Sequence, residues 1–124
     1  MAHLVLVEDD EALAGLLSAH LRATGYVVSV ARTAEDALEA LAGGLRPDLL
    51  LLDINLPGDT GWSVLRDEAY VTAGRPPVVV ASAMSVSPAR LRELGVAGYL
   101  PKPFALETLR STIERLLTKE SAEA

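Results

Sequence analysis

The sequence predicts an α/β domain in which a five-stranded parallel sheet is the middle layer of a three-layer α/β/α sandwich. Short aliphatic runs alternate with amphipathic helix patterns from one end of the chain to the other. The runs at 49–52 and 78–81 are apolar without a period of two, which is typical of parallel strands covered on both faces. Right-handed crossovers make 2-1-3-4-5 a common strand order for such a chain.

Five segments are predicted as strands. In chain order they are residues 3–7, YVVSVA from Tyr26, DLLLLD from Asp48, PVVVASA from Pro77 and GYLPKPF from Gly98. Helix patterns lie between them, as expected for a parallel sheet.

Three helices are predicted from apolar faces and caps. Gly25 is expected as the C-cap of the first helix, and Thr33 opens the second with a pattern that resembles a capping box. The apolar faces are Leu13, Leu17 and Leu21 in the first helix, Ala34, Ala37, Leu38 and Leu41 in the second, and Leu106, Leu109, Ile113, Leu116 and Leu117 in the last.

Two further helices are predicted from weaker patterns. Residues 62–71 place only Trp62, Leu65 and Ala69 at helical spacing. Residues 88–94 are short, with Ser87 as N-cap and a proline in the first turn.

Composition limits the function classes. A chain of 124 residues fits one domain, which we place at 1–118 with a polar C-terminal tail at 119–124. The net charge is −6 with no basic run, so we expect no direct contact with nucleic acid. The absence of cysteine excludes disulfides and thiolate metal sites. With no signal-peptide pattern and no membrane span, we expect a cytoplasmic protein.

Acidic residues follow two strands that meet at one edge of the predicted sheet. Glu8 and Asp9 come after the first strand and Asp53 ends the third. In doubly wound sheets the functional site lies beyond the carboxyl ends of the strands, at the switch point between these two. Because converging carboxylates repel one another, a hard divalent cation would stabilise them. We expect Asp9 and Asp53 to bind Mg²⁺ directly and Glu8 to act through water.

The other strand ends add a hydroxyl at Ser82 and an ammonium at Lys102. We expect Lys102 to pair with one carboxylate and still reach a phosphoryl oxygen. An aspartate can act as a nucleophile and form an acyl phosphate. Asp53 is the best candidate because it stands alone at the tip of the central strand, before the turn Asn55-Leu56-Pro57-Gly58.

From about Leu4 to Leu117 the chain resembles the receiver domain of bacterial two-component response regulators. The resemblance depends on LVEDDE, LLLDINLPGDTGW, VVVASA and GYLPKPF, which occur in this order. Each motif alone is a weak signal, whereas the ordered set is strong.

The resemblance implies a role for each matching residue. Asp53 would be the phosphoacceptor, Glu8 and Asp9 the acidic pair that holds Mg²⁺, and the Asn55 main-chain carbonyl a third protein ligand. Ser82 and Lys102 would contact the acyl phosphate, with Lys102-Pro103 as a cis peptide. Tyr99 would move inward when the Ser82 hydroxyl binds phosphate.

The resemblance also implies the partners. The donor would be a histidine kinase or a histidine phosphotransfer protein, and the signal would pass to a downstream effector protein or to an effector domain removed from this chain. The domain would not be an enzyme acting on an external substrate, because it catalyses only its own phosphorylation and dephosphorylation.

Three alternatives stay open at this point. A degenerate receiver would act as an interaction module that never accepts phosphate. A flavodoxin-like FMN-binding protein would need a Ser/Thr/Gly-rich phosphate loop where this chain has EDDE. An Asp-nucleophile phosphatase would need a second aspartate two residues after the nucleophile, where this chain has Asn55.

Overall fold

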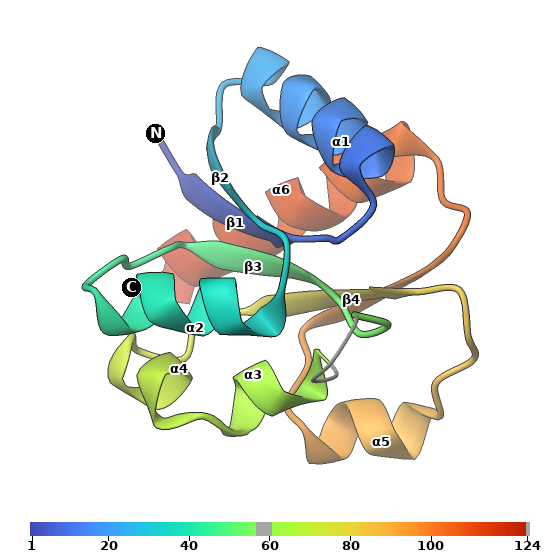
Figure 1. Ribbon diagram of the computed structural model, residues 1–124. Helices are drawn as coiled ribbons and strands as arrows, with labels where there is room; N and C mark the ends of the chain where they lie inside the picture. Colours follow the sequence, from blue (N-terminus) through green and yellow to red (C-terminus); the bar gives the residue numbers. More distant parts are fainter. Residues whose placement is uncertain (57–60, 124) are drawn as a thin grey trace.

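The computed structural model describes residues 1–56 and 61–123, which form a five-stranded sheet between two layers of helices (Figure 1). The strand order β2-β1-β3-β4-β5 confirms the predicted order, and all neighbouring strands are parallel. The strands are β1 (His3–Val7), β2 (Val27–Ala31), β3 (Leu49–Asp53), β4 (Val78–Ser82) and β5 (Gly98–Pro101). The helices are α1 (Glu11–Ala23), α2 (Ala34–Ala42), α3 (Trp62–Arg66), α4 (Glu68–Thr72), α5 (Pro88–Glu93) and α6 (Leu106–Glu123).

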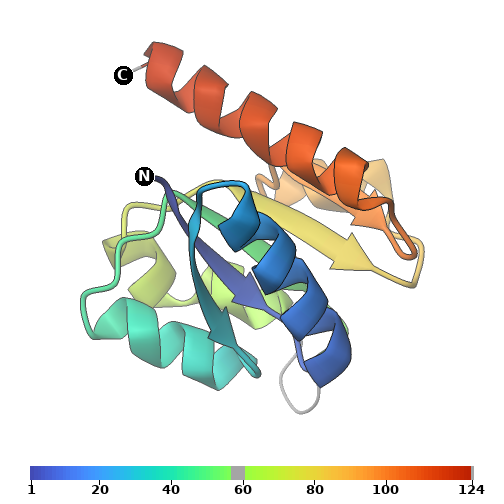
Figure 2. The same cartoon turned by 90° about the horizontal axis from the view of Figure 1, so that it is seen from above.

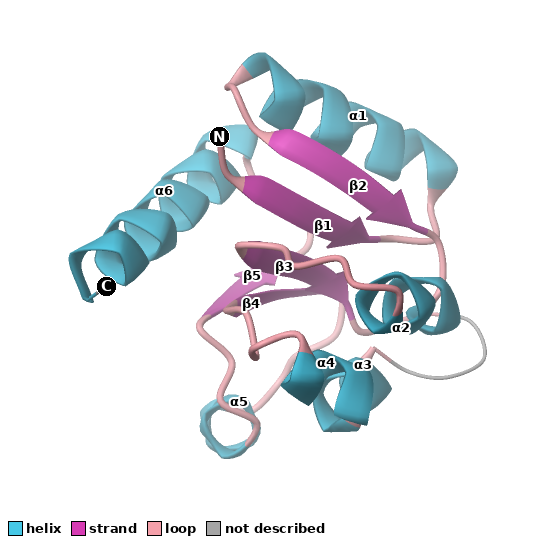
Figure 3. Cartoon of the chain, turned by 90° about the vertical axis from the view of Figure 1, so that its left-hand side faces the viewer, coloured by secondary structure: helices cyan, strands magenta, loops and turns pink. Residues whose placement is uncertain are grey.

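The sheet buries both of its faces because successive strand side chains point to opposite sides. Leu4 and Leu6 pack on one face of β1, while Val5 and Val7 pack on the other. Helices α1 and α6 cover the first face, and α2, α3, α4 and α5 lie on the second (Figures 2 and 3). All five residues of β3 and of β4 are buried, which explains their uninterrupted apolar runs.

Short polar side chains cap the starts of α1, α2 and α5, as expected for N-caps. The Leu13 N–H donates to Asp10, the Asp36 N–H to Thr33 and the Arg90 N–H to Ser87. At the other end of α1 the C-cap is Thr24, and Gly25 follows it with φ of 105°. The chain therefore leaves α1 through the left-handed Gly25, one position after the observed C-cap and at the residue predicted to end the helix.

The predicted helix at 62–71 is two short helices. The backbone of Asp67 is extended, with ψ of 144°, and ends α3. Its carboxylate then accepts a 2.9 Å hydrogen bond from the Ala69 N–H and caps α4. An aspartate satisfies a free N–H at a helix start better than it continues a helix, and the sparse apolar pattern of this segment does not oppose the break.

Two other boundaries differ from the predicted ones, and one predicted turn is only partly described. Strand β5 ends at Pro101, one residue before Lys102. Helix α6 continues through 119–123, the segment predicted as a polar tail. In the turn predicted after Asp53, Pro57 and Gly58 lie outside the described residues.

Candidate functional site

Three carboxylates meet at the carboxyl ends of β1 and β3. Glu8 and Asp9 directly follow β1, and Asp53 is the last residue of β3. One oxygen from each residue lies within 4.8 Å of the others, so the switch-point rule places them correctly. Glu8 and Asp53 are only 2% and 4% exposed, whereas Asp9 is exposed.

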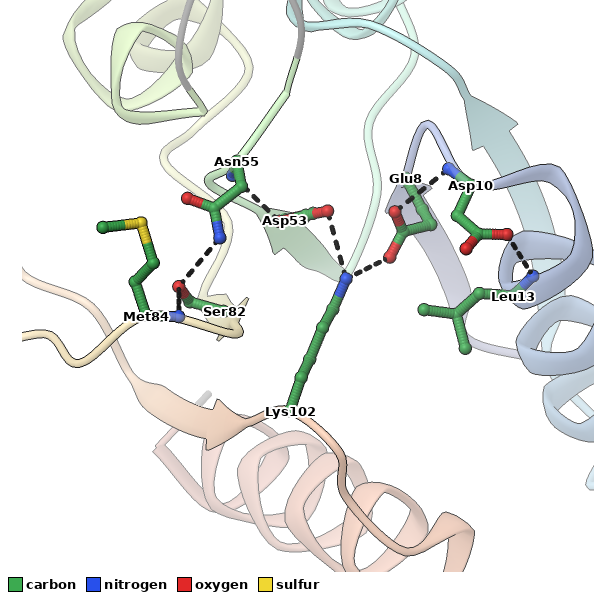
Figure 4. A network of polar contacts seen from close by, with 8 residues as sticks. All are labelled: Glu8, Asp10, Leu13, Asp53, Asn55, Ser82, Met84 and Lys102. Carbon is green, nitrogen blue, oxygen red and sulfur yellow. Dashed lines mark hydrogen bonds and ion pairs between the residues drawn. The ribbon is translucent and has the colours of Figure 1, made fainter.

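The ammonium of Lys102 lies between the two buried carboxylates. Its Nζ is 2.7 Å from Glu8 Oε1 and 3.1 Å from Asp53 Oδ2 (Figure 4). The Lys102 N–H donates to the Ser82 carbonyl at 2.8 Å, which fixes the start of the side chain beside β4. An ammonium has three donors, so Lys102 binds both acids at once.

Burial affects the two members of the ion pair differently. Burial raises the pKa of Glu8, although the hydrogen bond from Lys102 opposes this effect. Burial lowers the pKa of Lys102, but its hydrogen bonds to Glu8 and Asp53 outweigh burial and raise the pKa overall. The Glu8 side chain is 3% exposed and that of Lys102 is 19% exposed, so the carboxylate loses more hydration. Lys102 is therefore cationic at neutral pH.

Asn55 and Ser82 form a second polar group beside Asp53 (Figure 4). The Asn55 N–H donates to Asp53 Oδ1 at 2.9 Å, and the Asn55 side-chain amide donates to Ser82 Oγ at 3.1 Å. The Met84 N–H also donates to Ser82 Oγ, at 3.0 Å. Sequence reasoning missed Met84 because a main-chain donor carries no side-chain signal.

Tyr99 reaches the same segment from β5. Its side chain packs at the edge of the core, and its hydroxyl donates to the Met84 carbonyl at 3.1 Å. Met84 therefore contacts Ser82 through its N–H and Tyr99 through its carbonyl. The predicted cis peptide at Lys102-Pro103 is present.

The donor set fits a hard divalent cation. Three carboxylates face one ammonium, so the ionised cluster keeps a net negative charge. Oxygen ligands of this kind suit Mg²⁺, which usually takes one or two carboxylates and completes its shell with water and phosphate oxygens. The exposed Asp9 leaves the cluster open toward solvent on one side.

Comparison with known proteins identifies the family. Residues 4–114 match the response regulator receiver domain. The chain belongs to this family. The match covers most of the chain, so it excludes the flavodoxin-like and phosphatase alternatives. Receiver domains are signalling domains rather than enzymes with an external substrate.

Relatives and solved structures agree with this assignment. The response regulator MprA of Mycobacterium ulcerans is 36% identical over 122 residues, which are 97% of this chain and 52% of the relative. This receiver domain spans about half the length of the curated relatives it matches.

Two solved structures share the fold. The CheY-like receiver domain protein of Methanospirillum hungatei covers 100% of this chain and 99% of its own, with a TM-score of 0.91 and 23% identity. The response regulator TrrA of Thermotoga maritima, solved in complex with Mg²⁺-BeF, covers 94% of this chain and 99% of its own, with a TM-score of 0.80 and 27% identity. Among the described residues, the helices are too short or too polar to cross a membrane.

Proposed function

We propose that this receiver domain accepts a phosphoryl group on Asp53 from a phosphohistidine of a histidine kinase or a histidine phosphotransfer protein. The observation that carries the proposal is the position of the Asp53 carboxylate. It is buried at the carboxyl end of the central strand, where the Lys102 ammonium and the Asn55 N–H both donate to it. The complete set of polar partners favours a phosphorylated receiver over a degenerate one.

The transfer uses Asp53 as the nucleophile. A carboxylate oxygen forms a bond to phosphorus while the bond from phosphorus to the donor imidazole nitrogen breaks, and that nitrogen keeps the electron pair. Lys102 lies 3.1 Å from the carboxylate, so its positive charge offsets the negative charge brought by the phosphoryl oxygens. The product is an acyl phosphate on Asp53.

The acidic cluster is the proposed Mg²⁺ site. Asp9 and Asp53 would bind the ion directly, Glu8 through a water molecule, and Asn55 through its main-chain carbonyl. When bound, Mg²⁺ supplies positive charge against the phosphoryl oxygens. The structure of TrrA with Mg²⁺-BeF, a complex of a relative with 27% identity, supports this assignment.

The phosphoryl group then changes the surface of the domain. The Ser82 hydroxyl would donate to a phosphoryl oxygen, and the segment that carries Met84 would follow it. Because the Tyr99 hydroxyl donates to the Met84 carbonyl, this movement would change the position of Tyr99. An effector that binds the surface near α5 and β5 would detect the change.

The remaining assignments complete the proposal. We assign residues 1–118 to the receiver unit and place its action in the cytoplasm, without direct binding of nucleic acid. The effector is a separate protein or a further domain.

Phosphorylation can be tested with acetyl phosphate and Mg²⁺. Intact-mass spectrometry of the wild-type protein should show one added phosphoryl group, and Asp53→Asn should show none. Asp48→Asn is the matched control, because Asp48 directly precedes the same strand but lies at its opposite end. This control should be modified like the wild type. A wild-type protein that stays unmodified, or an adduct that persists in Asp53→Asn, would refute the assignment.

A further inference from the structure

Asn55 contacts both residues that the proposed function places around the phosphoryl group. Its N–H donates to Asp53 Oδ1 at 2.9 Å, and its side-chain amide donates to Ser82 Oγ at 3.1 Å. Asn55 lies two residues beyond β3, while Ser82 ends the neighbouring strand β4. One side chain therefore connects the strand of the phosphoacceptor to the strand of the hydroxyl.

The Ser82 hydroxyl is held by two donors. A hydroxyl has two acceptor lone pairs and one hydrogen. Within the described part of the chain, Ser82 Oγ accepts from the Asn55 amide and from the Met84 N–H, so both lone pairs are occupied. Ser82 is 1% exposed, so solvent has little access to replace either bond.

We infer that the Asn55 side-chain amide is a latch that holds the Ser82 hydroxyl in its unphosphorylated position. The inference rests on the proposed function, in which Ser82 turns its hydrogen toward a phosphoryl oxygen. The three bonding directions around the hydroxyl oxygen are fixed relative to one another, so this rotation disturbs both existing bonds.

The two bonds oppose the rotation differently. Met84 lies two residues after Ser82 on the same segment, so its N–H can move with the hydroxyl. Asn55 follows the neighbouring strand β3 and its N–H is bonded to Asp53, so its side-chain amide does not move with the Met84 segment. The Asn55 bond is the one that must break, and Asn55 is a positioning residue that acts through Ser82.

The latch also reaches Tyr99. The Met84 carbonyl accepts from the Tyr99 hydroxyl at 3.1 Å, and the Met84 N–H donates to Ser82. A movement of Ser82 is therefore passed through Met84 to Tyr99. Moving Tyr99 therefore requires that the hydrogen bond from the Asn55 amide to Ser82 be broken. The side chain at position 55 would therefore determine how much free energy the interaction of Ser82 with the phosphoryl group must supply before Tyr99 moves.

The test is a beryllofluoride titration of protein saturated with Mg²⁺, with saturation established for each variant. Trp62 fluorescence is a suitable signal because Trp62 lines one cavity together with Asn55 and Met84. Asn55→Ala should bind beryllofluoride about two- to fivefold more tightly than the wild type, since one partly exposed hydrogen bond no longer opposes the change. Ser85→Ala, a change in the lining of the same cavity, is the matched control and should leave the affinity unchanged.

The higher beryllofluoride affinity of Asn55→Ala must depend on the Ser82 hydroxyl. In a Ser82→Ala background, Asn55→Ala should give no tighter binding, which a general structural effect of the substitution would not reproduce. Equal or weaker binding by Asn55→Ala, or a gain that persists without the Ser82 hydroxyl, would overturn the latch.

A second measurement needs no phosphoryl analogue. In EDTA, the Met84 amide hydrogen should exchange with solvent faster in Asn55→Ala than in the wild type, because the freed hydroxyl holds the Met84 N–H less firmly. Absence of beryllofluoride binding by the wild type would refute the proposed function. Unchanged Met84 exchange would refute the latch itself.

Discussion

Lys102 Nζ lies 2.7 Å from Glu8 Oε1, although the two residues are 94 positions apart in the sequence. The same nitrogen is 3.1 Å from Asp53 Oδ2, so a single cation joins the ends of β1, β3 and β5. Removing this cation would leave two buried carboxylates close together. The ion pair therefore contributes to the stability of the fold as well as to the proposed chemistry.

Replacing Lys102 with methionine should destabilise the metal-free protein. Lys102→Met keeps most of the apolar stem but leaves Glu8 and Asp53 without their cation, and we expect a loss of about 1–3 kcal/mol in the free energy of unfolding. Urea denaturation in EDTA measures the loss. Addition of Mg²⁺ should recover part of it.

A matched control for this variant is Arg32→Met. Arg32 lies 3.5 Å from Glu11 in an exposed ion pair, which should contribute about 0–1 kcal/mol. Equal losses in the two variants would show that the buried position of Lys102 has no special importance.

Asp9 should matter for Mg²⁺ but not for folding. It is exposed and lies beside two buried acids, so Asp9→Asn removes repulsion and should leave the metal-free stability equal or higher. If Asp9 is a direct ligand, as proposed, its loss should weaken Mg²⁺ binding about tenfold or more. Calorimetric titration with Mg²⁺ measures the affinity.

Asp10→Asn controls for the general loss of negative charge. Asp10 caps α1 by accepting from the Leu13 N–H, and asparagine is an equally good N-cap. We expect nearly unchanged Mg²⁺ affinity in this variant, and a weakening equal to that of Asp9→Asn would contradict the assignment of Asp9 as a ligand.

A side chain at position 61 should disturb the end of β3. A Cβ on Gly61 would lie 2.5 Å from the Asp53 carbonyl oxygen and 2.8 Å from the Ile54 Cα, and both neighbours are main-chain atoms that cannot turn aside. Gly61→Ala should therefore cost roughly 1–3 kcal/mol of stability and reduce phosphorylation of Asp53. Thermal denaturation and the acetyl phosphate assay provide the two readouts.

Gly15→Ala is the opposite case. Gly15 lies inside α1, and its Cβ would meet nothing within 4 Å, so alanine should stabilise the protein by about 0.5–1 kcal/mol. A Gly61→Ala protein as stable as Gly15→Ala would contradict the contact at Asp53.

The raised pKa of Glu8 should give the metal-free protein a characteristic pH dependence. A carboxyl whose folded-state pKa lies above its ordinary value of 4.5 binds more protons when folded than when unfolded. Stability therefore falls as pH rises from about 4.5 through the folded-state pKa, and the penalty is absent below 4.5.

Glu8→Gln isolates this contribution, because Lys102 stays cationic over the whole range. In EDTA, the free energy of unfolding of the wild type minus that of Glu8→Gln should decrease between pH 4.5 and neutrality. Urea titrations at several pH values measure the difference. A difference that increases with pH would mean that the ion pair with Lys102 outweighs the burial of Glu8.

The sequence by itself determined the layered architecture and the location of the site. Uninterrupted apolar runs can be buried only if both faces of a strand are covered, and this pattern identified β3 and β4. The parallel order places the carboxyl ends of β1 and β3 together, so the sequence predicts Glu8, Asp9 and Asp53 as neighbours, as the structure has them. These inferences needed only the apolar runs and the parallel order of the strands, both of which can be read from the sequence.

Only the tertiary structure decided how the polar groups are paired. Lys102 binds both Glu8 and Asp53, and the Asn55 amide donates to Ser82. The Met84 N–H donates to Ser82, and the Met84 carbonyl accepts from Tyr99. These choices depend on side-chain rotamers and on the few ångströms between the ends of neighbouring strands, which no periodicity records. The break between α3 and α4 was also not predicted, since Asp67 could cap a helix or continue one, and the structure shows it as the cap of α4.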